Sequence, residues 1–299
     1  MIVEQINNSF IGYTENCDIH IREYYNYCLS LLKNRLNKIK TSLNVILGNY
    51  SVNFNNSNKI IKIDIQCEHT IVKIGGRSVN EIIYSGLEPI IDEIYLVRID
   101  KYDYLKTLDC VIEYSLGNVE NIKSKKRFNE FSQKISYVSP LLFDINFNNQ
   151  DKNDIITLSV NDTNVRRTFI KNKLLNYDIP YKNVDNCFSN HDLKSLYNTT
   201  KILVNIHQTD HHRTFEELRV LPALLNGVLI VSEEVPYKEY IPYYEYIIWC
   251  KYENIPEMVN QIHKNYTVFY NTTFNTGKLK EILDIMKYNN SITFNNLLK

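Results

Sequence analysis

The sequence predicts an α/β fold divided into two domains. Short apolar runs that suit buried parallel strands alternate with segments whose apolar residues recur at helical spacing, and this alternation continues through both halves of the 299-residue chain. A stretch rich in Asn, Asp and Gln, 143–153, separates the halves and has the composition of a linker. We therefore expect a first domain over 1–148 and a second domain that begins at 149.

The first half contains the clearest strand pattern in the chain. Ile61, Ile63 and Ile65 alternate with polar residues, which is the period of a strand with one buried face. A helix is expected over 22–40, because its apolar residues fall on one face. The other elements expected here are strands at 9–13, 43–47, 71–74, 94–99, 110–114 and 136–139 and a short helix at 102–106.

The second half alternates strands and helices more regularly. Ser189 or Asn190 is the expected N-cap of a helix over 191–197. The other elements expected here are strands at 155–160, 202–206, 228–231 and 246–249, helices that begin at 166 and 215, and helices over 256–269 and 278–287.

The helix that follows the strand at 202–206 has the sharpest boundaries. Thr214 followed three places later by Glu217 is a capping-box pattern, which predicts the start of the helix. Asn226-Gly227 predicts a left-handed stop. Pro222 lies inside the helix, where it removes a backbone hydrogen bond, and we expect a kink there.

Composition and charge limit the classes of function. Lys+Arg and Asp+Glu both number 34, so the formal net charge is zero, whereas a nucleic-acid binder normally carries a basic excess. No apolar run approaches the roughly eighteen residues of a membrane span, and the first residues lack the pattern of a signal peptide. The six cysteines are scattered without a Cys-x-x-Cys pair, which favours reduced thiols. We expect a protein of the cytoplasm, or of the host cytoplasm if it is viral.

The polar loop at 207–213 carries most of the candidate chemistry. It follows an apolar strand and precedes a helix, so it lies at the carboxyl end of a predicted parallel strand, where α/β proteins bind ligands. N–H groups at the start of the helix suit a phosphate, and Arg213 or a histidine would add charge-assisted bonds. A polar loop that only caps the helix is the alternative. The candidate binding residues are His207, Gln208, His211, His212, Arg213, Thr214, Phe215, Glu216, Glu217 and Arg219.

A metal site is the weaker interpretation of the same loop. His207 and His211 are four residues apart, but they lack the His-Glu-x-x-His pattern. On a loop, a spacing of four residues does not aim two imidazole rings at one ion. We therefore expect no metal.

The order strand, polar loop, helix, Gly, strand resembles the donor-binding half of nucleotide-sugar glycosyltransferases of the GT-B type, in particular the domains of families 1 and 4. The resemblance covers roughly 155–266. Arg219 stands eight residues before Gly227, where many members have a basic residue. Many members also have a glutamate five residues before that glycine, which holds the donor ribose. This chain has Pro222 there, and Glu216 or Glu217 are the candidate substitutes.

The resemblance implies two Rossmann-like domains that face each other across a cleft. The first, 1–148, would bind the acceptor, the second, 149–272, would bind the nucleotide sugar, and the helix in 273–299 would cross back onto the first domain. The implied reaction moves a sugar from a nucleoside-diphosphate sugar, such as a UDP or GDP sugar, to a hydroxyl of a glycan or another acceptor. The chain has no Asp-x-Asp motif, so a metal-independent mechanism without a cofactor is expected. Arg166 and Arg167 would lie at the cleft and pair with the diphosphate, unless they are simply solvated residues that open a helix.

The end of the strand at 61–66 is the candidate acceptor side. Burial of charged or imidazole side chains at the end of an apolar strand is costly, so their presence there suggests a function. One such function is that of a general base that activates a hydroxyl. Paired glycines would let the backbone approach a ligand closely. A hairpin turn around a satisfied carboxylate is the alternative. The candidate catalytic residues are Glu68 and His69, and the candidate cleft residues are Thr70, Gly75, Gly76 and Arg77.

Two other functions fit the same residues. One is a nucleotide-sugar epimerase of the same fold, which needs acids that remove and return a leaving group. The other is a binding module for nucleotide sugars or glycans that no longer turns over, which the proline in place of the ribose glutamate favours. The sugar, the base, the acceptor, the oligomeric state and the stereochemical outcome are left open by the sequence.

Overall fold

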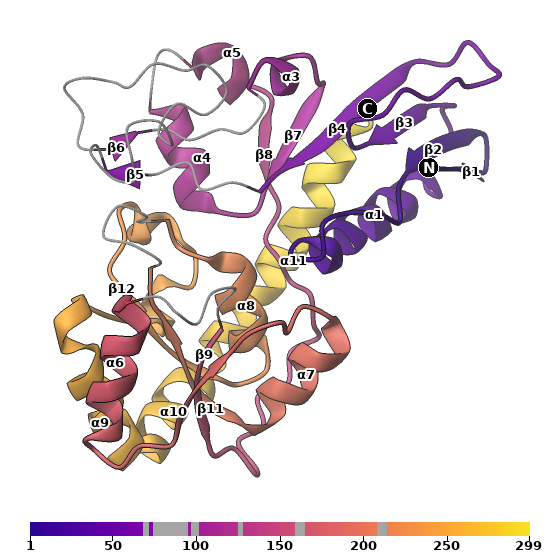
Figure 1. Cartoon of the computed structure of the whole chain (residues 1–299). Helices are drawn as coiled ribbons and strands as arrows, with labels where there is room; N and C mark the ends of the chain where they lie inside the picture. Colours follow the sequence, from indigo (N-terminus) through magenta and orange to yellow (C-terminus); the bar gives the residue numbers. More distant parts are fainter. Residues whose placement is uncertain (68–71, 74–94, 97–101, 125–127, 159–164, 208–213) are drawn as a thin grey trace. The chain divides into compact units, whose positions relative to one another are not determined.

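The chain folds into two units, each built around a mainly parallel sheet, and the predicted α/β class is confirmed (Figure 1). The computed structural model describes all residues except 68–71, 74–94, 97–101, 125–127, 159–164 and 208–213. The first unit comprises Met1–Ser139 with Lys287–Lys299, and the second comprises Pro140–Met286. The roles predicted for 1–148, 149–272 and 273–299, and a cleft between the domains, stay predictions.

The sheet of the first unit begins with a hairpin that the sequence pattern did not predict. Strands β1 and β2 are antiparallel and turn at Asn7, whose φ of 52° is left-handed. The other neighbours in the six-stranded order β1-β2-β3-β4-β7-β8 are parallel. The strands are Ile2–Ile6, Ser9–Tyr13, Asn44–Leu47, Ile60–Gln66, Cys110–Glu113 and Ile135–Tyr137.

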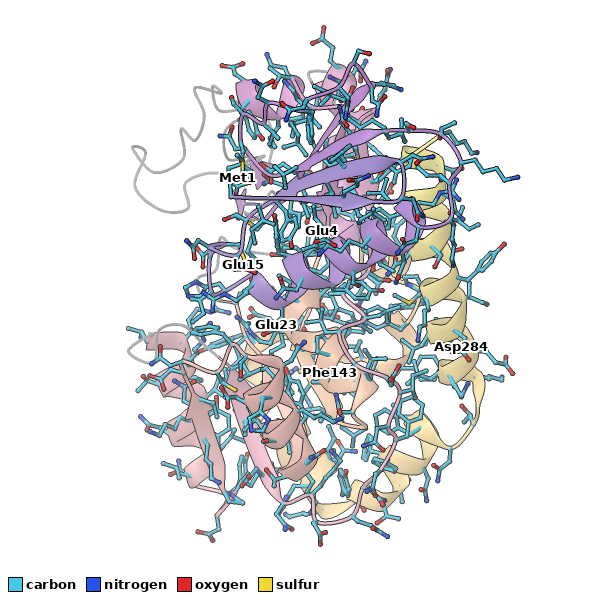
Figure 2. All side chains as sticks on the ribbon, turned by 90° about the vertical axis from the view of Figure 1, so that its right-hand side faces the viewer. Met1, Glu4, Glu15, Glu23, Phe143 and Asp284 are labelled. Atoms are coloured by element: carbon cyan, nitrogen blue, oxygen red, sulfur yellow. The ribbon has the colours of Figure 1, made fainter. Side chains whose placement is uncertain are left out.

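Helix α1, Arg22–Leu36, buries the apolar face that its spacing predicts, with Tyr24, Cys28 and Leu32 at its centre. Glu4 of β1, which is labelled in Figure 2, accepts hydrogen bonds from Lys33 of this helix at 2.6 Å and from Tyr13 at 3.0 Å. Within the expected strands at 71–74 and 94–99, the residues that the structure describes form an antiparallel ribbon of β5 and β6. The bounds of this ribbon and of three further helices are β5 Val72–Lys73, β6 Tyr95–Leu96, α3 Tyr102–Lys106, α4 Leu116–Lys123 and α5 Asn129–Ser132. Helix α11, Lys278–Leu297, begins in the second unit and ends in the first.

The second unit contains a five-stranded parallel sheet in the order β10-β9-β11-β12-β13. From β9 the chain moves to β10 at one edge, then returns to the other side of β9 for β11 and continues outward. The order of strands therefore reverses between β9 and β11. Such a reversal is the topological switch point of an open α/β sheet, and ligands bind there beyond the carboxyl ends of the strands. The strands are β9 Asp154–Leu158, β10 Tyr181–Val184, β11 Thr200–Asn205, β12 Leu229–Glu233 and β13 Ile248–Cys250.

Helices cover both faces of this sheet (Figure 1). Helix α6, Val165–Leu175, and helix α9, Ile255–Lys264, lie together on one face. Helix α7, Asn190–Thr199, and helix α8, Glu217–Leu225, lie on the other. Helix α10, Tyr266–Phe274, follows α9. Because apolar residues of the central strands are fully buried between these layers, the strands read as continuous apolar runs. These residues include Ile155, Ile156, Leu203, Val204 and Ile230.

The ends of these helices test the predicted caps. Ser189 is confirmed as the cap of α7, since its Oγ accepts the amide hydrogen of Asp192 at 3.1 Å. The stop of α8 is also confirmed, because Gly227 has a φ of 66° and its amide bonds to Leu224. The single helix expected over 256–269 is instead two helices, α9 and α10, that break at Asn265.

Candidate functional site

The candidate site lies at the carboxyl ends of β9 and β11, where the sheet order reverses. The described residues around this point come from the start of α6, from the end of β11, from the segment leading into α8 and from the end of β12. Gln208, His211, His212 and Arg213 lie outside the described residues.

Glu233, the last residue of β12, binds two of these segments at once. Its Oε1 accepts a hydrogen bond from Nη2 of Arg166 at 2.5 Å, and its Oε2 accepts the amide hydrogen of His207 at 3.1 Å. Nδ1 of His207 lies 3.4 Å from the same Oε2. The carboxylate therefore connects the start of α6 to the residue that follows β11.

Arg166 is held in addition by Tyr252 of the short helix η4, Tyr252–Asn254. The guanidinium carbon lies 3.9 Å from the centre of the tyrosine ring, and the tyrosine hydroxyl donates to the carbonyl of Arg166 at 2.8 Å. The predicted pairing of Arg166 with a diphosphate thus competes with an ion pair and an aromatic contact within the protein.

Arg167 and Arg219 bring two positive charges to the switch point from opposite faces of the sheet. Burial and the positive charge of Arg219 lower the pKa of Arg167 to about 10, and the carboxylate of Glu216 opposes this effect. Arg219 donates through Nη1 to Oδ1 of Asn205, the last residue of β11, at 3.2 Å. Asn205 is itself buried and donates to Ser232 of β12 at 3.0 Å. The second guanidinium is thereby fixed at the carboxyl edge of the sheet.

The predicted capping box at the start of α8 is wrong. The helix begins at Glu217 with Glu216 as its N-cap, which makes no side-chain capping bond, and Thr214 lies two residues before that cap. The amide of Glu217 donates to Phe215 and that of Arg219 donates to Glu216, both through backbone carbonyls. These amides are already engaged within the protein, which is unfavourable to the expectation that this helix start cradles a phosphate through them.

The two candidate ribose acids lie in different surroundings. Glu217 is fully buried and accepts a hydrogen bond from the hydroxyl of the equally buried Tyr243 at 2.9 Å. Phe215 is also buried, with its ring centre 4.9 Å from that of Trp249. Both residues therefore serve the packing of the unit. Glu216 is half-buried and close enough to Arg167 to affect its pKa, so of the two acids it lies nearer the candidate site.

The predicted acceptor residues Glu68, His69, Thr70, Gly75, Gly76 and Arg77 lie outside the described residues. Two polar residues just before them are described and buried. Gln66 and Glu113 are neighbours in register at the carboxyl ends of β4 and β7. Glu113 accepts hydrogen bonds from the amide of Ser115 at 3.0 Å and from Asn118 at 3.3 Å. Its carboxylate caps the segment that leads into α4.

Two further features concern metals and membranes. Among the residues that the structure describes, no three His, Cys, Asp or Glu side chains come together as a metal site. Within the same residues, no helix has both the length and the apolar character to cross a membrane. The cysteines are free thiols, three of them buried and Cys67 exposed.

Sequence reasoning missed Glu233, Asn205 and Tyr252. Glu233 carried a usable signal, since it is an acidic residue two places after the apolar run 228–231 and therefore stands at the carboxyl end of a parallel strand. Asn205 is the single amide in the apolar run 202–206. Tyr252 carried no signal, because it is one of 23 tyrosines and its role depends on a partner 86 residues away.

Comparison with known proteins gives distant similarities. No protein-family model matches the chain. Uncharacterized protein R358 of Acanthamoeba polyphaga mimivirus is 29% identical over 208 residues, which are 64% of this chain and 71% of that protein. The crystal structure of TarM matches 91% of this chain with 12% identity and a TM-score of 0.49. The GtfA/B complex bound to UDP and GlcNAc matches 89% with 11% identity and a TM-score of 0.32. The chain spans 58% and 57% of those two chains, and at TM-scores below 0.5 neither likeness decides fold or function.

Proposed function

We propose that the chain is a glycosyltransferase of the GT-B type that transfers a sugar from a nucleoside-diphosphate sugar to an acceptor hydroxyl. The second unit would bind the nucleotide sugar at the carboxyl ends of β9 and β11, and the first unit would bind the acceptor. Support comes from the sequence resemblance over 155–266 together with a topological switch point at the predicted place.

The observation that carries the proposal is the pair of guanidinium groups at this switch point. Arg167 is 5% exposed, and its burial and the repulsion from the positive charge of Arg219 disfavour its charged form. A bound dianion would relieve this repulsion, and it would form charge-assisted hydrogen bonds with planar donors that match phosphate geometry. The diphosphate group of a nucleotide sugar is an anion of this kind.

The proposed mechanism uses protein cations in place of a metal. As the bond between the sugar and the diphosphate breaks, negative charge grows on the leaving oxygen, and preorganised Arg167 and Arg219 would stabilise it. Glu216 would contact the ribose where relatives have a different glutamate. His69 or Glu68 would accept the proton of the acceptor hydroxyl if the configuration inverts.

Calorimetric titration with UDP, GDP and ADP tests the donor site. We expect at least one of them to bind the wild-type protein. Arg167→Met and Arg219→Met should each weaken binding by roughly tenfold to a hundredfold, the value of a hydrogen bond to a charged group. Lys194→Met, an exposed position on α7 of the same unit, is the matched control and should bind like wild type. Absence of binding by the wild type to all three nucleotides would refute the proposal.

Turnover is tested separately by following matching sugar nucleotides by NMR with and without an acceptor panel. Transfer of the sugar to an acceptor, or its slow transfer to water, with release of the nucleoside diphosphate is the expected result. Interconversion of the sugar without an acceptor would instead identify an epimerase. Tight binding without any reaction would identify a binding module.

A further inference from the structure

Glu233 stands where three segments of the second unit meet. It ends β12, while Arg166 opens α6 after β9 and His207 follows β11. The carboxylate binds both of these residues, through Oε1 and Oε2 respectively. It therefore joins the chain segments that leave the two strands of the switch point.

This junction is well shielded from solvent. The exposed fractions of the side chains are 14% for Glu233, 16% for Arg166 and 2% for His207. Charge-assisted hydrogen bonds at such low exposure are stronger than those of a surface ion pair. Removal of the carboxylate would take an ion-pair partner from a guanidinium that is only 16% exposed, which is destabilising. We expect the start of α6 to shift in response.

The junction also affects the proposed binding residue Arg167, which follows Arg166 in the chain. Arg167 shares its backbone, so a shift at the start of α6 also moves the guanidinium assigned to the diphosphate. The amide of His207 fixes the first residue after β11 in the same way. A displacement of about 1 Å at a ligand-bearing segment can cost roughly a hundredfold in function, and a rigid supporting shell prevents it.

We propose that Glu233 is a positioning residue for the nucleotide-sugar site. It holds the start of α6 and the end of β11 in the arrangement that receives the diphosphate, without touching the ligand itself. This inference rests on the proposed function, because the site that Glu233 supports is the donor site.

The test uses UDP and GDP as probes and compares Glu233→Ala and Glu233→Gln with Asp154→Ala. Asp154 is a matched control, because it opens β9 at the opposite, amino end of the same sheet. It is also a partly buried acid, which binds Lys182 at 2.7 Å and Thr199 at 3.0 Å. Both alanine variants lose an ion pair, but only Glu233→Ala loses one at the switch point.

We expect Glu233→Ala to raise the Kd by roughly tenfold to a hundredfold, and Asp154→Ala to leave it within about twofold of wild type. Glu233→Gln keeps one amide oxygen as acceptor and should recover part of the affinity. Hydrogen exchange at the amide of His207 should accelerate in Glu233→Ala and stay unchanged in Asp154→Ala.

Three results would overturn the inference, and they are distinguishable. Wild-type affinity in Glu233→Ala would show that the junction does not position the site. An equal loss in Asp154→Ala would show that only global stability matters. Absence of nucleotide binding by the wild type would remove the proposed function, and the inference would fall with it.

Discussion

Lys152 shows how a single residue of this chain joins distant segments. It is 5% exposed, and its Nζ donates to the carbonyls of Tyr197 at 2.5 Å and of Asn226 at 3.0 Å. These carbonyls belong to the last turn of α7 and to the C-cap of α8, where partial negative charge collects. One ammonium group therefore holds the carboxyl ends of both helices on this face of the sheet.

The pKa of Lys152 predicts a pH dependence of stability. Burial lowers this pKa from 10.5 to about 8. Between these values the unfolded chain binds more protons than the folded one, so the free energy of unfolding rises with pH over this window. The rise from this group is at most about 3 kcal/mol, because part of the charge is screened. Urea denaturation of wild type and Lys152→Met from pH 7.5 to 10.5 should show this component in the wild type alone. Parallel curves for both proteins would contradict it.

A second prediction at this scale concerns Asn290. Its Nδ2 donates to the carbonyl of Ser139 at 2.9 Å, and its Oδ1 accepts both the amide and the hydroxyl of Ser139 at 3.0 Å. Asn290→Ala would leave these buried groups without that partner, so we expect a loss of about 1–3 kcal/mol in the free energy of unfolding. Asn289→Ala, its exposed neighbour on α11, is the control and should change stability by less than about 0.5 kcal/mol. Equal effects in the two variants would refute the role of Asn290.

At the scale of the element, the end of α8 requires a left-handed residue, and the glycine in the sequence predicts this requirement. Gly227 has a φ of 66°, its amide bonds to the carbonyl of Leu224, and the amide of Val228 bonds to that of Ala223. This pair of bonds is the Schellman motif, for which glycine is favoured. A Cβ at this position would lie 3.2 Å from the Cα of Phe147, so the turn is also closely packed.

Gly277 provides a matched comparison for this turn. It has a φ of 76°, but a Cβ there would meet no atom within 4 Å. Gly277→Ala should therefore cost only the left-handed conformation, about 1–2 kcal/mol, whereas Gly227→Ala should cost more because the backbone of 147–148 must also move. Thermal denaturation of both variants measures the difference. A smaller loss for Gly227→Ala than for Gly277→Ala would contradict the packing assigned to this turn.

Elements with a buried periodic pattern were predictable, and elements stabilised by long-range pairing were not. The three central strands of the second unit, β9, β11 and β12, appear as apolar runs because both faces are covered. By contrast β10, Tyr-Lys-Asn-Val, is a largely polar edge strand that exists through its pairing with β9. The hairpin strand β1 and the helices α4 and α5 were missed for a similar reason, since each is short. The break at Asn265 is hidden because helical periodicity continues across it.

The candidate site was predictable in position but not in its contacts. A polar loop after an apolar strand pointed to the carboxyl end of β11, which the switch point supports. The partners depend on tertiary structure. Arg166 pairs with Glu233 across 67 residues, and Arg219 pairs with Asn205 across the edge of the sheet. The capping box failed because the segment 214–216 packs Phe215 into the core before the helix begins.

At the scale of the whole molecule, ligand binding should raise the free energy of unfolding. A nucleoside diphosphate that binds only the folded chain raises the free energy of unfolding by about 2.7 kcal/mol at a concentration of 100 times its Kd. We expect this stabilisation in thermal denaturation of the wild type with the nucleotide that binds. Arg167→Met at the same nucleotide concentration should lose at least about half of it, while Lys194→Met keeps it. An equal shift of the midpoint in all three proteins would show that the nucleotide binds elsewhere.

The most direct measurement is a crystal structure of the full chain with the nucleoside diphosphate that binds in solution. We predict that the diphosphate lies beyond the carboxyl ends of β9 and β11, with phosphate oxygens in hydrogen-bonding contact with the guanidinium groups of Arg167 and Arg219. A diphosphate bound at any other place, or one that contacts neither arginine, would contradict the central claim.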